Sequence, residues 1–140
     1  MKKVIMLFVA ICATSLVWAD ESGNCGDNVN YTFEESTGTL TISGAGDMTS
    51  NPWVSYYSSI KTVVIESGVT SIGVSAFNGC NALTNVTIPN SVTRIEELAF
   101  DGCEGLTSVT IPNSVTSIGG HAFAYCDNLT YVNIRIVSRA

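Results

Sequence analysis

The chain has 140 residues, of which 46% are hydrophobic and only 13% are charged, and its formal net charge at pH 7 is −6. This length is enough for one compact domain but not for two. We expect the N-terminal segment with Lys2 and Lys3 to be removed, which leaves four basic residues against twelve acidic ones, a net charge of −8. Nucleic acids and anionic lipid surfaces are therefore not expected as partners, because binding them requires concentrated positive charge.

Residues 1–19 have the pattern of a secretory signal peptide. Lys2 and Lys3 precede an apolar stretch, residues 4–13, and a short segment that ends at Ala19 follows it. A transmembrane helix requires about 20 consecutive apolar residues, which is more than this stretch offers. We expect cleavage after Ala19, a secreted or cell-surface location, and no membrane insertion after cleavage.

Residues 20–59 are predicted to form a β-hairpin cap and a lead-in segment. Apolar and polar residues alternate through Val29, Tyr31 and Phe33, and again through Leu40 and Ile42, with a turn-forming stretch between the two runs. This alternation is typical of two half-buried strands. The hairpin is expected to cap the N-terminal edge of the following repeats. Further along, the pair Trp53-Val54 occupies the register of the later Ala-Phe pair, so its aromatic ring is expected to cover the first coil's open end.

The C-terminal part of the chain repeats itself at a constant offset of 23 residues. A partial coil, 60–71, precedes three full coils, 72–94, 95–117 and 118–140. A fixed period in the twenties that repeats apolar positions one by one is typical of a solenoid, in which each coil buries its inward residues against the next. The repeated columns are Ile72/Ile95/Ile118, Phe77/Phe100/Phe123, Cys80/Cys103/Cys126, Leu83/Leu106/Leu129, Val86/Val109/Val132 and Ile88/Ile111/Ile134.

Spacing within one coil predicts its parts. Val86 and Ile88 alternate with polar residues, which indicates a short strand with two side chains pointing inward. Pro89 ends this strand because proline has no N–H for a ladder. Apolar residues three apart after the proline predict a bent second edge of the coil. The same spacing at Phe77, Cys80 and Leu83 predicts a short 3₁₀ segment.

The last repeat departs from the pattern, with Arg135 and Arg139 in its final stretch. One interpretation is that these charges discourage edge-to-edge strand pairing. The other is that the chain is a fragment of a longer array. Neither interpretation gives Arg135 or Arg139 a chemical role.

The repeated blocks closely resemble the BspA-like leucine-rich repeats of secreted and surface proteins. The resemblance rests on Ser71-Ile72-Gly73, Ala76-Phe77, Cys80, Leu83-Thr84 and the run Val86-Thr87-Ile88-Pro89-Asn90-Ser91-Val92-Thr93, repeated downstream. It implies a β-dominated α/β solenoid, a leucine-rich repeat array of 23-residue coils with an N-terminal β-hairpin cap. It also implies adhesion to proteins, cells or glycans at a cell surface, and it supplies no catalytic residues.

The cysteine and histidine residues form no pattern that predicts a catalytic, cofactor or metal site. The cysteine column at 80, 103 and 126 is interpreted as small buried apolar residues more than as disulfides, because parallel side chains that point into a core rarely have the disulfide torsion. A metal site is not expected, since metal ligands normally come in pairs two to four residues apart. For Cys25, a free thiol, an intermolecular bridge and a pairing with a column cysteine all remain open. His121, the only histidine, is expected at a solvated surface position. We expect a protein that is not an enzyme and uses no cofactor.

The outward side of the strand ladder remains as the candidate ligand face. Regularly spaced hydroxyl and amide groups beside one tyrosine suit recognition of a peptide or a sugar. We therefore predict a recognition or adhesion module that binds a protein or glycan partner. The alternative is a spacer or display segment of a longer surface protein, in which these polar residues only suit exposed strand positions. The candidate face consists of two columns, Thr62, Asn85, Ser108, Tyr131 and Val64, Thr87, Thr110, Asn133.

Overall fold

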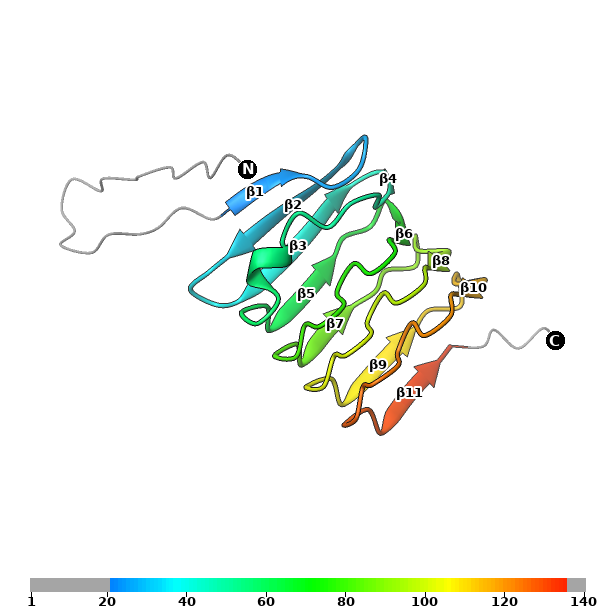
Figure 1. Ribbon diagram of the computed structural model, residues 1–140. Coiled ribbons are helices and arrows are strands. Elements are labelled where there is room, and N and C mark those ends of the chain that lie inside the picture. Colours follow the sequence, from blue (N-terminus) through cyan, green and yellow to red (C-terminus); the bar gives the residue numbers. More distant parts are fainter. Residues whose placement is uncertain (1–20, 136–140) are drawn as a thin grey trace.

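In a computed structural model, which describes residues 21–135, successive coils of the chain stack side by side into a solenoid (Figure 1). The predicted signal peptide and the end of the last repeat, including Arg139, lie outside the described residues. Apart from one short 3₁₀ helix, η1, the regular elements within residues 21–135 are strands: β1 (Glu21–Asn24), β2 (Val29–Glu34), β3 (Thr39–Gly44), β4 (Gly46–Asp47), η1 (Val54–Tyr56), β5 (Thr62–Ile65), β6 (Val69–Ile72), β7 (Asn85–Thr87), β8 (Arg94–Ile95), β9 (Ser108–Ile111), β10 (Ser117–Ile118) and β11 (Tyr131–Ile134).

One wall of the solenoid is a strand ladder. β1 and β2 pair antiparallel, β2 and β3 form the predicted hairpin, and from β3 onward the pairing is parallel, through β5 to β7. Leu40 pairs with Val63, and Val63 pairs with Val86, each step being 23 residues. The hairpin is therefore confirmed, and its second strand is also the first rung of the parallel stack.

The second wall consists of shorter parallel strands in the order β10-β8-β6-β4. β8 and β10 contain only two residues each, in agreement with the predicted bent edge. In Figure 1 these strands line the edge opposite the ladder.

The third wall is a series of tight turns that are hydrogen-bonded to the next coil. The predicted 3₁₀ segment is replaced by separate turns, such as the one closed by the Cys80 N–H on the Phe77 carbonyl. Alternate backbone N–H groups point to the following coil instead, as when the Phe77 N–H donates to the Ala99 carbonyl at 2.8 Å. Because half of the donors serve the neighbouring coil, a regular 3₁₀ helix cannot form there.

The turn wall contains a left-handed backbone position that the sequence does not mark with glycine. Ser75, Leu98 and His121 have φ values of 54°, 59° and 56°, one residue in each coil. Glycine is the usual residue in this region because a Cβ is unfavourable there. In the first two of these coils the N–H groups of Ser75 and Leu98 donate to carbonyls of the next coil, which helps to hold this conformation without glycine.

A column of stacked aromatic rings runs through the core, as the repeat predicts. Phe77 stacks on Phe100 and Phe100 on Phe123, with ring centroids 5.2 Å apart in both pairs. Trp53 stacks on Phe77 at 5.7 Å, is fully buried, and donates its indole N–H to the Ala76 carbonyl at 2.8 Å. The tryptophan therefore covers the first coil's end as expected, although it lies one residue ahead of the phenylalanine register. Val54, which has that register, is 49% exposed.

The core is complete at the N-terminal end and open at the C-terminal end. Leu40 and Ile42 of β3 are fully buried, because β2 and η1 lie beside them. Val132 and Ile134 of β11 have the same register but are 45% and 58% exposed. Each coil thus buries its inward residues against the next.

Candidate ligand-binding face

The strand ladder directs two columns of side chains away from the core, and we call this side the ladder face. Thr62 pairs with Asn85 and Val64 with Thr87, while Ser108 pairs with Tyr131 and Thr110 with Asn133. On β5, β7 and β9 these positions are more exposed than the residues between them, and β11 continues the register of β9, which places all eight predicted positions on the same outward side. Thr62, Val64 and Asn133 are half-buried, and Tyr131 is 62% exposed.

The ladder face extends beyond the predicted residues. Thr39 pairs with Thr62 and Thr41 with Val64, so both columns begin one strand earlier, on β3. The sequence carries the signal, because Thr39 precedes Thr62 by 23 residues and Leu40 and Ile42 precede Val63 and Ile65 by the same offset. The same residues also fit the alternation of a hairpin strand, so the sequence alone did not identify them as part of the repeat.

The two columns are interrupted between β7 and β9. The ladder strands fall into one sheet that ends at β7 and a second sheet made of β9 and β11. Pro112 lies at the register where Arg135 donates its backbone N–H to the Ile111 carbonyl at 3.0 Å. Since proline has no N–H, the carbonyl of Ile88 loses the corresponding bond. Pro89 has the same register one coil earlier, where β5 and β7 still pair, so the missing N–H does not by itself account for the interruption. The predicted regular columns are divided into two halves between the two sheets.

The core shows the same interruption. Val86 and Ile88 on β7 and just after it are only half-buried. The residues at the same register in the coil before and the coil after, Val63 and Ile111 among them, are 0 to 3% exposed. The opening between the strands thus brings apolar side chains of the core to the surface.

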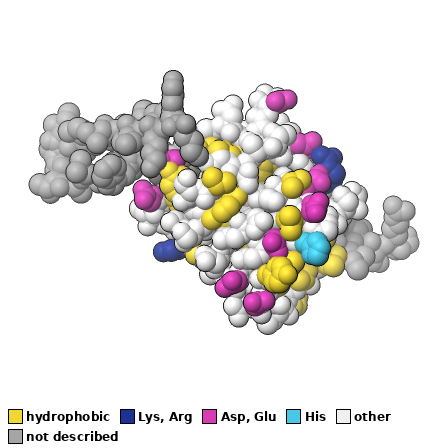
Figure 2. Space-filling view, in the orientation of Figure 1, with side chains coloured by type: hydrophobic (Ala, Val, Ile, Leu, Met, Phe, Trp, Pro, Cys, Tyr) yellow, Lys and Arg dark blue, Asp and Glu magenta, His cyan; other side chains and the backbone are white. Residues whose placement is uncertain are grey.

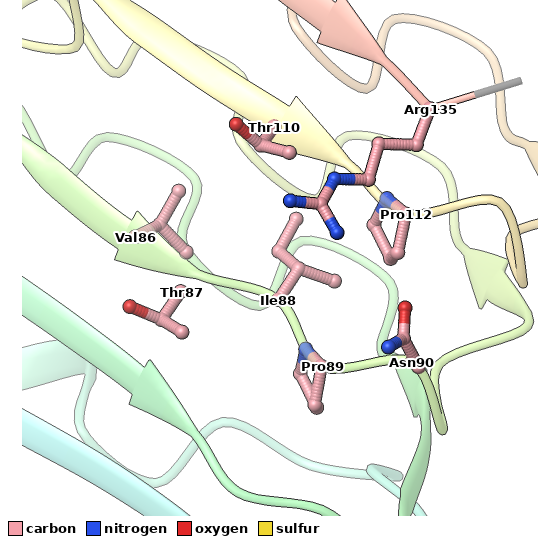
Figure 3. A pocket seen from close by; sticks show the side chains of 8 residues that line it. All are labelled: Val86, Thr87, Ile88, Pro89, Asn90, Thr110, Pro112 and Arg135. Atoms are coloured by element: carbon pink, nitrogen blue, oxygen red, sulfur yellow. The ribbon is translucent and has the colours of Figure 1, made fainter.

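A cavity of about 320 Å³ lies at this interruption. Its apolar lining comes from Val86, Ile88, Pro89 and Pro112, and its polar lining from Thr87, Asn90, Thr110 and Arg135. Figure 3 shows the Arg135 side chain extending from the end of β11 past Pro112, with its guanidinium turned toward Thr110 and Ile88. Two predicted face residues, Thr87 and Thr110, therefore line the same cavity as an arginine that no sequence motif marks.

The ion pairs of the described residues lie on the second wall, away from the ladder face. Arg94 donates to Asp47 at 2.9 Å and to Glu96 at 3.0 Å. The Thr70 hydroxyl donates to the Asp47 carboxylate at 2.6 Å, and this bond, with help from Arg94, lowers the pKa of Asp47 below its ordinary value. In Figure 2 acidic side chains are spread over the visible face, whereas Lys and Arg lie at its margins.

The cysteines of residues 21–135 have free thiols. Cys25, Cys80 and Cys103 are buried and Cys126 is half-buried, in agreement with their interpretation as core residues. Burial raises the pKa of both Cys25 and Cys80 to about 12, so these thiols are poor nucleophiles. Within residues 21–135 Cys25 does not pair with a column cysteine.

The other residues considered for chemistry are dispersed. His121 is exposed, as predicted, on the turn wall. Residues 21–135 contain no group of three or more His, Cys, Asp or Glu side chains that could hold a metal ion. The same part of the chain has no helix that is long and apolar enough to span a membrane.

The family model of the BspA type leucine rich repeat region (6 copies) matches residues 54–138. The chain belongs to the BspA-type leucine-rich repeat proteins. Repeats of this kind are commonly used for protein interaction, and they typically form structural or binding modules rather than enzymes. No curated protein matches the chain.

Several solved structures are similar to this BspA-type chain. A leucine rich cell surface protein from Faecalibacterium prausnitzii is 41% identical with a TM-score of 0.54, over 57% of this chain and 21% of that protein. A leucine-rich repeat protein from Eubacterium ventriosum is 24% identical, with a TM-score of 0.57 over 84% of this chain and 44% of that one. One from Bacteroides capillosus is 24% identical, with a TM-score of 0.56 over 79% and 96% of the two chains.

These structures support the solenoid fold, and the first is named as a cell-surface protein. The BspA-type chain spans about a fifth of the length of the Faecalibacterium protein and less than half of the Eubacterium one.

Proposed function

We propose that this protein is an exported recognition or adhesion module that binds a protein or glycan partner through its ladder face. The observation that carries the proposal is a difference between two sets of hydroxyl groups. Thr84, Thr93, Thr116 and Thr130 beside the strands each donate a side-chain hydrogen bond to a backbone carbonyl one coil earlier. These bonds join neighbouring coils.

The polar groups of the ladder face make no such bonds. Within residues 21–135 the side chains of Asn85, Thr87, Ser108, Thr110 and Tyr131 have no hydrogen-bond partner, and all five are exposed. Hydrogen-bonding groups that make no bond within the protein, and that repeat at the spacing of a sheet, can together recognise a peptide or an oligosaccharide. Tyrosine is a frequent anchor at binding interfaces because it offers a large apolar ring with a polar tip.

A binding screen with two double variants tests the proposal. The purified protein is applied to immobilised matrix proteins and glycans, and Asn85→Ala combined with Tyr131→Ala is expected to weaken the binding at least about tenfold. The matched control is Asn81→Ala combined with Tyr125→Ala, which removes the same residue types from the turn wall, where Tyr125 is 74% exposed.

The result separates the proposed function from its alternative. Binding that is lost in the ladder-face variant and kept in the control supports recognition through the ladder face. Equal binding by both variants excludes the ladder face. A protein that binds nothing on either surface fits the spacer or display segment.

A further inference from the structure

The cavity between β7 and β9 carries one positive charge and no negative charge, in a protein that is otherwise acidic. Arg135 is its only charged lining residue, and within residues 21–135 this guanidinium takes part in no ion pair. Its backbone N–H is bonded to the Ile111 carbonyl at 3.0 Å, which fixes the start of the side chain at the end of β11. An anchored, unpaired arginine with no acidic residue around it favours an anionic ligand group, and its planar fork matches a carboxylate.

The rest of the lining is suited to a polar ring with an apolar face. The hydroxyls of Thr87 and Thr110 and the amide of Asn90 can donate or accept hydrogen bonds. The carbonyl of Ile88 lacks its ladder donor because Pro112 has no N–H. The half-buried side chains of Val86 and Ile88 offer apolar surface beside these groups. A volume of about 320 Å³ is at the lower end of small-molecule sites and fits one ring-sized unit.

A peptide strand fits the same place poorly. A strand that joins a sheet edge needs alternating N–H and C=O groups on the strand beside it. At this interruption the ends of both flanking strands lead into prolines, Pro89 and Pro112, which supply no N–H donor at that end of the cavity. Recognition at that end must therefore use side chains.

We propose that the cavity between β7 and β9 binds a carboxylate-bearing sugar residue of a glycan. Arg135 holds the carboxylate, and Thr87, Thr110 and Asn90 bind the ring hydroxyls. This assignment rests on the proposed function, because it names the ligand class for one part of the ladder face.

The test is a titration of the purified protein with three small probes, in which binding is measured by calorimetry or by NMR chemical shifts. Glucuronic acid carries the ring and the carboxylate, glucose carries the ring alone, and an N-acetylglutamate amide carries a carboxylate without the ring. We expect glucuronic acid to bind at least about tenfold more tightly than either of the other two. Arg135→Gln is expected to remove this preference, and Thr110→Val is expected to weaken glucuronic acid binding several-fold.

Arg94→Gln on the second wall is the matched control and is expected to leave the titration unchanged. Circular dichroism melting of each variant shows whether it remains folded. Equal affinity for glucose and glucuronic acid, or an unchanged titration in Arg135→Gln, overturns the proposal. Tighter binding of the glutamate amide overturns the sugar assignment in favour of an acidic side chain.

The same variants separate this inference from the function of the ladder face. If the immobilised partners found in the screen depend on Tyr131 and Asn85 but not on Arg135, the face binds and the cavity assignment is wrong. If neither variant changes the binding, both proposals fail.

Discussion

The two ends of the solenoid have the same repeat but different burial. At the N-terminal end, Ile42 and Ile65 are 0 and 2% exposed. At the C-terminal end, Ile134 has the same register and is 58% exposed. The side chain is identical, so the difference comes entirely from the neighbouring coil. Stability in this protein is therefore a property of the contact between coils more than of any one coil.

The largest expected difference between the two ends is in thiol reactivity. Cys80 is fully buried and Cys126 is half-buried, although they hold the same place in their coils. We expect a thiol reagent to label Cys126 in the folded protein and to reach Cys80 only after unfolding, at least about a thousandfold more slowly. Mass spectrometry of labelled peptides over time measures this.

Because burial raises the pKa of Cys80 to about 12, its thiolate fraction in the folded state stays far below that of an ordinary thiol between pH 7 and pH 10, so its labelling should remain slow over this range. Cys126→Ser should remove the rapid labelling of the folded protein. Fast labelling of Cys80 in native buffer would contradict the closed core.

The aromatic column provides the next largest effect. Phe77 is fully buried between Trp53 and Phe100, whereas Phe123 is half-buried at the open end. Phe77→Ala should lower the free energy of unfolding by about 3–5 kcal/mol, and Phe123→Ala by roughly half as much. Denaturant titration of both variants checks this. Equal losses would mean that the two ends are equally well packed.

A pair of conservative substitutions compares the packing of the two ends more finely. Ile65→Val removes one methylene from the closed end and should cost about 1 kcal/mol, while Ile134→Val at the open end should cost less than about 0.5 kcal/mol. Thermal melting resolves such a difference in a domain of this size. A larger loss for the Ile134 variant would show that something covers β11.

The sequence predicts the stacked core closely and the ladder face only in part. The constant offset identifies Phe77, Phe100 and Phe123 as one column because burial repeats with the apolar residues. It does not reveal the interruption, because residues 86–93 and 109–116 are identical and so carry no sign of which gap opens. Arg135 lines a cavity only because that opening exists, so the repeat pattern predicts no role for this residue. The left-handed positions were missed because Ser75, Leu98 and His121 share no chemical feature.

The smallest effect is expected on the second wall near the closed end, where Asp47 bonds Thr70 and Arg94. These groups are exposed, so solvent weakens their interaction. The pKa of Asp47 is lowered in the folded state, so its stabilisation is present above the unfolded value and is lost as the pH falls through the folded one. Asp47→Asn should thus lower the melting temperature slightly at pH 7 and not at pH 2. A larger effect at pH 2 would contradict this assignment.

One aromatic core continues through the coils from Trp53 to Phe123, and the fold depends on it. Trp53 is the only tryptophan after residue 19, so its fluorescence reports on the closed end. Unfolding of Phe123→Ala is followed by this fluorescence and by far-ultraviolet circular dichroism. We predict that both midpoints fall together by the same amount, although the substitution lies at the opposite end of the column. A Trp53 midpoint that stays at the wild-type value while the circular dichroism midpoint falls would show that the coils unfold independently, and it would contradict the shared core.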